Sequence, residues 1–356
     1  MRAAVLKQLN SDLAILENIQ IPELKNGQVL VKIAYSGICH SQLMEVRGLR
    51  GEDKYLPHLL GHEGTGTVTA IGAGVTKVKP GDKVVLSWIK GKGIEAGGSV
   101  YAHAAMNKIN AGGVTTLSDW SVVSENRVTP LPEGVPMDIG ALFGCAVLTG
   151  AGIVKNALQP KSGSSIVLLG LGGIGMSALM ATHLFECKTI IAADINDSKL
   201  SLAKELGATH TVNTSREDLL KTVMEITKGA GTDYGFEAAG RKDTIELAFA
   251  CIKRFGGKLV FASHPEQGAK IEIDPYDLIC GKQIVGSWGG SSNPDEDIPA
   301  FAKLYLAGKL PLEKLMDRRY SLDEVNVALN SMENNQAMRP IVSFDETQDG
   351  GGKHGR

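Results

Sequence analysis

The sequence predicts an α/β protein, with a β-rich N-terminal domain followed by a doubly wound parallel-sheet domain. Two observations support this fold class. Up to about residue 145 the apolar residues alternate over short runs such as Val29, Val31 and Ile33, and turns such as 79–85 separate the runs, which is typical of antiparallel strands. From about residue 147 continuous apolar runs alternate with helical patterns, which indicates βαβ units.

The second half of the chain can be divided into elements in order. A strand at 164–170 precedes a helix at 173–185, and a strand at 189–194 precedes a helix that we expect Asp197 to cap. Strands follow at 209–213, 233–239, 258–263 and 283–288, with helices at 215–228 and 241–254 between them. Two more helices, at 295–308 and 322–332, lead to an extended run at 339–344.

This order predicts three folded segments and a tail. Residues 1–146 form the β-rich domain, 147–288 form the parallel-sheet domain, and 289–345 return to the first domain. Residues 346–356 are polar and glycine-rich, so we expect a disordered tail.

Composition excludes several classes of partner. The 356 residues carry a net charge of −2, which disfavours nucleic acid and anionic membranes. We also find no apolar run that approaches the length of a membrane span. The five cysteines are odd in number and far apart, unlike a disulfide framework. A reducing, cytoplasmic location is therefore expected.

A glycine-rich turn marks a nucleotide site. Gly170, Gly172 and Gly175 form a GxGxxG motif that follows a strand and opens a helix. A turn of this kind lets a pyrophosphate approach bare backbone at a helix N-terminus. Asp194 ends the next strand, where a carboxylate accepts from ribose hydroxyls and repels the 2′-phosphate of NADP. The sequence thus predicts a Rossmann domain that binds NAD, the alternative being a packing turn.

Cys39, His62 and Cys145 are the candidate metal ligands. Alone, each cysteine is ordinary core and the histidine an ordinary turn residue. Together, in front of a dinucleotide fold, they resemble the catalytic zinc set of the zinc-dependent alcohol dehydrogenases, the medium-chain dehydrogenase/reductase (MDR) family. The resemblance covers nearly the whole chain, including 308–326. It implies a GroES-like catalytic domain, one catalytic Zn²⁺ per subunit, and hydride transfer between NAD and a small alcohol or aldehyde.

The resemblance also implies roles for other residues. Ser41 would take the alcohol proton, Glu63 would lie close to the zinc, and Trp88 would wall the substrate pocket. The implied cofactor contacts are His40 at the pyrophosphate, Lys199 by the adenosine ribose, Thr149 near the nicotinamide and Arg339 at a phosphate. Read without the family, these are turn, capping, core or solvated surface positions.

The sequence departs from the family at two places. Many relatives hold a structural zinc on four close cysteines, but here the matching positions are Lys92, Glu95, Gly98 and Met106. Those side chains cannot form a closed tetrahedral site, so we expect a lobe held by other means. Gln42 stands where the family usually has an aspartate beside the zinc-binding histidine. An amide can accept a hydrogen bond there but cannot make the ligand more basic.

Three functions remain open from the sequence. The first is a zinc- and NAD-dependent alcohol dehydrogenase, which we expect to form a homodimer or homotetramer. The second is a biosynthetic dehydrogenase that oxidises one hydroxyl of a polyol or sugar derivative. The third is a non-catalytic NAD-binding scaffold, against which the intact ligand set argues.

Overall fold

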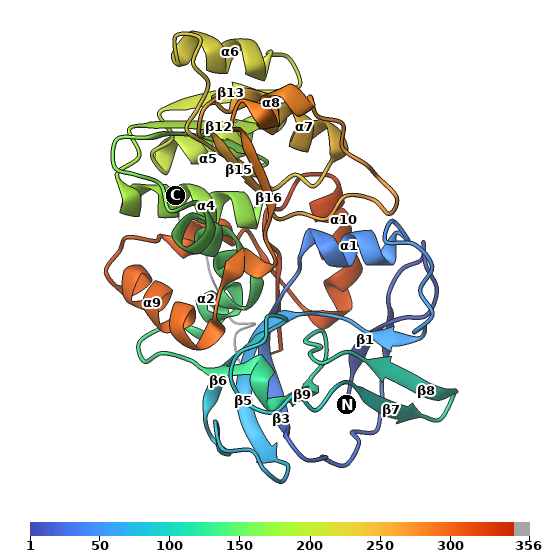
Figure 1. Ribbon diagram of the computed structural model, residues 1–356. Helices are drawn as coiled ribbons and strands as arrows, with labels where there is room; N and C mark the ends of the chain where they lie inside the picture. Colours follow the sequence, from blue (N-terminus) through green and yellow to red (C-terminus); the bar gives the residue numbers. More distant parts are fainter. Residues whose placement is uncertain (345–356) are drawn as a thin grey trace, which may run out of the picture. The chain divides into compact units, whose positions relative to one another are not determined.

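The computed structural model describes residues 1–344, which form two compact units (Figure 1). Within the described residues, the first unit comprises Met1–Arg47, Asp53–Gly144 and 316–344, and the second comprises Gly48–Glu52 and Cys145–Leu315. The tail expected at 346–356 lies outside the described residues.

The first unit is built on two mainly antiparallel sheets. The five-stranded sheet has the order β2-β1-β4-β8-β7. Its strands are β1 (Ala3–Leu6), β2 (Ala14–Leu16), β4 (His58–Leu59), β7 (Ser99–His103) and β8 (Met106–Ala111). The seven-stranded sheet has the order β10-β6-β5-β3-β18-β17, and β9 also pairs with β3. Its strands are β3 (Gln28–Gly37), β5 (Glu63–Ile71), β6 (Lys83–Ser87), β9 (Trp120–Ser124), β10 (Val128–Pro130), β17 (Arg319–Tyr320) and β18 (Ile341–Ser343).

The long strand β3 organises this unit. The predicted alternation is confirmed, because Val29, Val31 and Ile33 are buried in one core cluster with residues of β5, β6 and β9. Three helices complete the unit, α1 (His40–Val46), α2 (Met137–Leu142) and α10 (Val325–Glu333). Figure 1 shows α1, in blue, beside α10, in red, and both helices contribute to a second core cluster.

The lobe that lacks cysteines is held by Glu125. One carboxylate oxygen accepts from the backbone N–H groups of Thr76 and Lys77 at 2.7 and 2.8 Å, and the other accepts from Ile94 at 2.8 Å. The carboxylate therefore joins two loops. Gly93 has φ +111°, and a Cβ there would lie 2.8 Å from Cγ of Glu125, so the close approach of this loop requires a glycine.

Glu95 adds ion pairs to the same lobe. Its carboxylate lies 2.8 Å from Nζ of Lys90 and 3.4 Å from Nη2 of Arg127. The hydrogen bond from Lys90 and the positive charge of Arg127 lower the pKa of Glu95 to about 2. Acidic side chains thus hold the part of the chain where the four cysteines were expected to be missing.

The second unit is a six-stranded parallel sheet with the order β13-β12-β11-β14-β15-β16. Its strands are β11 (Ser165–Leu169), β12 (Thr189–Asp194), β13 (His210–Asn213), β14 (Tyr234–Glu237), β15 (Lys258–Phe261) and β16 (Gln283–Gly286). The order reverses between β11 and β14, which defines a doubly wound sheet with a ligand crevice at that point. The predicted fold class is confirmed.

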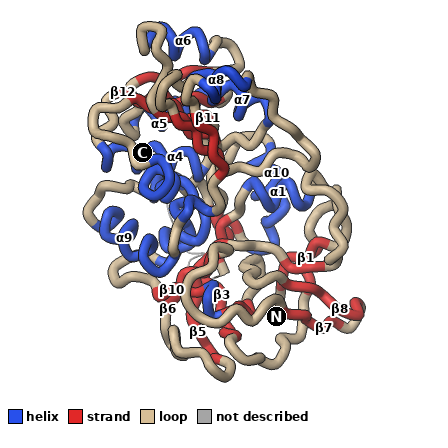
Figure 2. Tube along the Cα trace, viewed as in Figure 1, coloured by secondary structure: helices blue, strands red, loops and turns tan. Residues whose placement is uncertain are grey.

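The α-helices of the second unit, drawn in blue in Figure 2, are α3 (Leu148–Gly152), α4 (Gly173–Thr182), α5 (Asp197–Glu205), α6 (Leu219–Ile226), α7 (Lys242–Cys251), α8 (Pro275–Ile279) and α9 (Pro294–Leu306). Of these, α4, α5, α6 and α7 pack against strands of the parallel sheet. Residues of α6 and α7 share a core cluster with β11 and β12, whereas α4 packs on β11 and β12 outside that cluster. Asn196, not Asp197, caps α5, because its side chain accepts from the N–H groups of Ser198 and Lys199.

The return to the first unit comes later than residue 289. Residues 289–315 belong to the second unit, and the chain re-enters the first at Met316. The physical reason is packing around α9. Asp297 is paired with Lys155, and Ser292 donates to the carbonyl of Leu148 at 2.7 Å.

One helical run is long and apolar enough to cross a membrane, contrary to our reading of the sequence. It spans 22 residues, Met137–Leu158, and 94% of its most apolar window is buried inside the protein. It consists of α2, α3 and two π-helical segments. None of these segments alone is long enough to span a membrane, but together they form one continuous helix. Its burial identifies a core helix.

We predict that Glu125→Gln destabilises the protein at pH 7 by about 1–3 kcal/mol, because a charged acceptor of three backbone hydrogen bonds is lost. Burial opposes ionisation of this carboxyl, but hydrogen bonds from Thr76, Ile94 and Lys77 outweigh it and lower the pKa of Glu125. Its contribution is therefore complete above the ordinary glutamate pKa and is lost as pH falls through the lowered one. Urea unfolding of both proteins between pH 7 and pH 3 measures this.

The difference between the two proteins should shrink as the medium becomes more acidic. The control is Glu133→Gln, which removes an exposed carboxylate and should change the free energy of unfolding by less than about 0.5 kcal/mol. A pH-independent difference between wild type and Glu125→Gln would contradict the prediction.

Candidate metal centre and cofactor site

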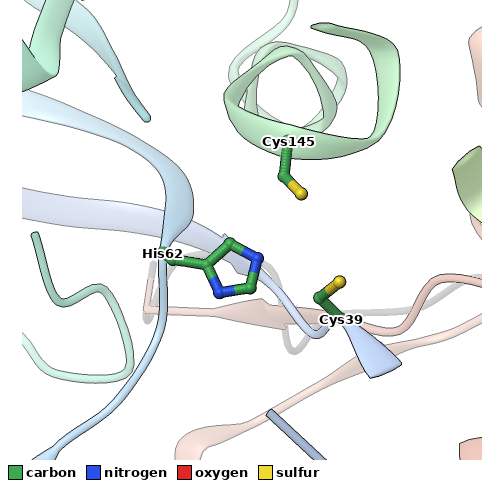
Figure 3. Close-up of side chains that lie close together, drawn as sticks. All are labelled: Cys39, His62 and Cys145. Carbon is green, nitrogen blue, oxygen red and sulfur yellow. The ribbon is translucent and has the colours of Figure 1, made fainter. Parts of the chain in front are cut away.

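The predicted metal ligands Cys39, His62 and Cys145 converge. Their donor atoms all lie within 4.8 Å of one another, and Figure 3 shows the three side chains turned toward a common point. Cys39 is the N-cap of α1, His62 immediately precedes β5, and Cys145 lies in the π-helical turn Phe143–Val147. Both cysteines are buried.

The residue before Cys145 is fixed within the first unit. The carbonyl of Gly144 accepts from Oγ of Ser87 at 2.7 Å. A Cβ on Gly144 would lie 2.3 Å from the carbonyl oxygen of Leu86 and 2.7 Å from Cβ of Glu63. Gly144 therefore has to be a glycine. One peptide bond connects this packed position to the Cys145 ligand.

The donor set fits zinc. Two thiolates and one imidazole around a tetrahedral zinc place their donor atoms about 3.5–3.8 Å apart, a spacing that the observed cluster can reach with small side-chain movements. Three protein ligands leave a fourth position for water or substrate, which is the arrangement of a catalytic zinc. No other cysteine joins the cluster, since the three remaining cysteines of the described chain are separate buried thiols.

A buried ion pair lies beside the ligands. Arg339 donates from Nε to Oε1 of Glu63 at 2.7 Å, and its Nη2 lies 2.6 Å from Oε2. Glu63 is fully buried and Arg339 is 3% exposed. A Cβ on Gly37 would lie 1.9 Å from Oε1 of Glu63, so this glycine makes room for the carboxylate. The structure thus gives the Arg339 guanidinium a carboxylate partner, and its contact with a cofactor phosphate stays a prediction.

Gln42 contacts Cys39 rather than a histidine. Its Oε1 accepts from the backbone N–H of Cys39 at 2.6 Å, and its side chain is buried. The residue occupies the third position of α1 and reaches back to the N-cap, as in a capping box. We had expected the amide near the metal-binding histidine. The reason for the difference is that helix geometry offers it the nearer N–H of a ligand residue.

The remaining candidates in the first unit lie close to the ligands along the chain. Ser41 is half-buried in the first turn of α1, two residues after Cys39, and His40 is exposed. Trp88 follows β6, is half-buried, and packs against the core cluster around β3. Their assigned roles are not tested by these positions and stay predictions.

The three glycines of the GxGxxG motif have different structural roles. Gly170 has φ +90°, and a Cβ there would lie 2.5 Å from the backbone nitrogen of Ala239. A Cβ on Gly175 would lie 1.9 Å from the carbonyl oxygen of Gly170, whereas a Cβ on Gly172 would meet nothing within 4 Å. In this fingerprint the first glycine allows a tight turn, the second leaves open space for a pyrophosphate, and the third allows close packing of helix and strand. The site fits a dinucleotide.

Polar groups around this loop agree with that fit. Asp194 ends β12 and is 9% exposed. Its carboxylate accepts from the N–H of Leu171 at 2.7 Å and from that of Asn196 at 3.0 Å. Lys199 lies in the first turn of α5, half-buried. Thr149 lies in α3, and its buried Oγ1 has no hydrogen-bond partner in the described chain, as expected of a group whose partner is a ligand.

The sequence analysis missed Glu237. This fully buried residue ends β14, and its Oε1 accepts from Thr244 and from the N–H groups of Ala239 and Gly240. Burial raises the pKa of Glu237 to about 6, against the lowering effect of those hydrogen bonds. The sequence does contain a signal that could have singled out Glu237, namely an acidic residue at the end of the strand next to the glycine-rich loop.

We predict that the purified protein retains one tightly bound zinc per chain and that Cys145→Ser loses most of it, together with most activity. The change leaves two strong ligands, too few for a catalytic zinc. Cys187→Ser, which alters a buried thiol of the second unit, is the matched control and should keep the metal. Elemental analysis gives the zinc content, and a ligand variant that keeps full zinc would refute the assignment.

We also predict that Gln42→Leu releases zinc to a chelator roughly 10- to 100-fold faster than wild type, because Cys39 loses the group that orients its backbone. Gln42→Glu keeps the acceptor at the third helix position and should release zinc at nearly the wild-type rate. The release rate is measured with a coloured chelator. Equal rates for all three proteins would show that Gln42 does not hold Cys39.

Comparisons with known proteins agree with this geometry. Residues 25–133 match the alcohol dehydrogenase GroES-like domain, and residues 173–307 match the zinc-binding dehydrogenase domain. The chain is 30% identical over 375 residues to S-(hydroxymethyl)glutathione dehydrogenase of Paracoccus denitrificans, which covers 96% of this chain and 99% of that protein. It is also 30% identical over 377 residues to alcohol dehydrogenase class-3 of Cereibacter sphaeroides, with 96% and 99% covered.

Among solved structures, benzyl alcohol dehydrogenase from Acinetobacter calcoaceticus is similar with a TM-score of 0.87 and 31% identity, covering 97% of this chain and 99% of that one. Similarity of this extent, together with the Cys39–His62–Cys145 cluster and the glycine fingerprint, shows the family. The chain belongs to the zinc-dependent alcohol dehydrogenases of the MDR family, which transfer a hydride between an alcohol and NAD.

Proposed function

We propose that this enzyme interconverts a primary alcohol and its aldehyde with NAD. The observation that carries the proposal is the convergence of Cys39, His62 and Cys145 in a chain that also has a complete dinucleotide fingerprint. Two relatives support the primary alcohol, since the benzyl alcohol and S-(hydroxymethyl)glutathione in their names both carry a CH₂OH group. A polyol or sugar hydroxyl is the alternative that the substrate panel below decides.

When bound, zinc supplies a Lewis acid that polarises the alcohol oxygen, and NAD supplies the hydride acceptor. We assign Ser41 the task of accepting the alcohol proton, because its hydroxyl is two residues from the Cys39 ligand. Trp88 is assigned to the wall of the substrate pocket, where an indole restricts bulky secondary alcohols. Glu63 and Arg339, as a buried pair, hold the adjoining His62 in place.

We assign the cofactor contacts to the chain's own groups in the same way. Asp194 binds the adenosine ribose and Lys199 lies next to it at the start of α5. We assign the exposed His40 to the pyrophosphate. We assign Arg339 to a phosphate of the bound cofactor. Thr149 is assigned to the nicotinamide, and its buried Oγ1 supports this.

We further propose a homo-oligomer in the cytoplasm. Strand β16 is the last strand of the parallel sheet, and Val285 and Trp288 are 42% and 80% exposed at this edge. An edge strand with large exposed apolar side chains favours pairing with a second copy. The described cysteines are all free thiols, which supports a reducing compartment. Sedimentation of wild type and Trp288→Lys tests the oligomer, and an unchanged mass would argue against this edge.

We predict NADH formation with primary alcohols, benzyl alcohol among them, and no turnover without zinc. A panel of primary, secondary and polyhydroxy alcohols, run with and without added zinc, measures this. Ser41→Ala should lower kcat by roughly 10²- to 10⁴-fold, the usual size of a general acid–base contribution. Turnover confined to polyols would replace our proposal of a primary alcohol substrate with a polyol substrate. Zinc-loaded protein that is inactive on the whole panel would favour a non-catalytic NAD-binding scaffold.

We predict that NAD is preferred over NADP, because the Asp194 carboxylate repels a 2′-phosphate. Asp194→Gly should raise the NADP-to-NAD ratio of kcat/KM by at least about 10-fold, which corresponds to 1.4 kcal/mol of discrimination. Asp197→Gly is the control, since it removes an exposed carboxylate three residues further along the chain. Equal efficiency of both cofactors with the wild-type enzyme would contradict the role of Asp194.

A further inference from the structure

A second group of metal-binding side chains lies in the first unit, formed by Glu45, Asp53 and His58. Their donor atoms all lie within 4.8 Å of one another. The three residues come from different segments, because Glu45 lies on α1, Asp53 on the following loop and His58 at the start of β4. Nothing in the proposed catalytic function uses them.

The contacts of His58 define which ring nitrogen faces the carboxylates. Nδ1 lies 2.9 Å from the carbonyl oxygen of Leu59, and a carbonyl only accepts, so Nδ1 carries a hydrogen. In the neutral ring Nε2 then presents a lone pair. That atom lies 2.8 Å from Oδ2 of Asp53 and 3.6 Å from Oε1 of Glu45. Two carboxylates facing this nitrogen call for a cation between them, which is either a proton on Nε2 or a metal ion.

The orientation of the group is typical of a metal site. Ligating histidines usually donate their other N–H to a carbonyl or carboxylate, and ligating carboxylates are themselves hydrogen-bonded. Here Leu59 orients the imidazole, and the backbone N–H of Tyr55 donates to Oδ1 of Asp53 at 2.8 Å. Oδ2 is thereby turned to Nε2. The side chains of His58 and Asp53 are only 9% and 14% exposed.

Charge is compatible with a metal ion. A divalent ion on the neutral ring would balance the charges of the Asp53 and Glu45 carboxylates. The distances agree as well, since a metal about 2.0–2.2 Å from each donor allows N···O separations of about 2.8–3.6 Å at ordinary coordination angles. The donor set of one imidazole and two carboxylates suits Mn²⁺ or Zn²⁺.

We propose that Glu45, Asp53 and His58 bind a divalent metal ion at a site separate from the catalytic zinc. The ion joins α1, whose N-cap is Cys39, to β4, which ends three residues before His62. It therefore braces two of the segments that carry catalytic ligands. Its role is structural, because all three donors belong to elements that precede or follow a ligand and none is a ligand of the catalytic zinc.

The test is a titration with Mn²⁺ of enzyme that holds one zinc per chain, so that only the catalytic site is filled; manganese avoids the thiolate site because it prefers nitrogen and oxygen donors. Electron paramagnetic resonance measures free Mn²⁺. We expect one bound Mn²⁺ per chain, with affinity reduced at least 10-fold in Asp53→Asn and Glu45→Gln. Asp82→Asn is the matched control, since Asp82 also accepts from a nearby backbone N–H, that of Lys79 at 2.9 Å.

A direct readout on the wild-type enzyme accompanies the variants. Bound Mn²⁺ should broaden the ring resonance of one histidine strongly, and that resonance should be absent from the spectrum of His58→Gln. This measurement needs no stable carboxylate variant. No saturable Mn²⁺ binding to the wild-type enzyme, or equal binding by Asp53→Asn, Glu45→Gln and Asp82→Asn, would overturn the proposal. Neither result affects NADH formation, which tests the catalytic function separately.

Discussion

The buried pair between Glu63 and Arg339 is the interaction on which the metal centre depends. Glu63 follows the His62 ligand directly, and Arg339 precedes Pro340, whose carbonyl accepts from the N–H of Ile38 at 2.9 Å. Ile38 in turn precedes Cys39. Two ligand segments are thus positioned through one buried ion pair. Removing either partner would leave an uncompensated buried charge, which costs about 3–5 kcal/mol.

The same unit holds its cysteine-free lobe with carboxylates. Glu125 accepts three backbone hydrogen bonds and Glu95 pairs with Lys90 and Arg127. A zinc on four thiolates contributes its binding energy only after the site has folded around it. Carboxylate clamps have no such requirement, but they weaken in acid because their pKa values are lowered by the folded structure. The stability of this lobe therefore depends on pH.

Much of this architecture could be predicted from the sequence because local patterns determine it. Strand periodicity identified β3, and the strand–glycine–helix order identified the NAD loop. The Cys39–His62–Cys145 set came from family resemblance, since residues so far apart along the chain do not reveal their proximity. Contacts made by long-range packing were beyond reach. Nothing in the sequence indicates that Arg339 pairs with Glu63. The chain returns to the first unit only at Met316 because of the packing around α9.

Gln42 shows why the chemistry of a residue is easier to predict than its partner. An amide at this position was expected to accept a hydrogen bond, and it does, but from Cys39 instead of an imidazole. The choice follows from reach, because the third residue of a helix lies next to the N–H of its own N-cap. The same backbone places Glu45 one turn further along α1, opposite His58. One short helix thereby presents a catalytic ligand at its N-cap and the carboxylate of the proposed second metal site in its last turn.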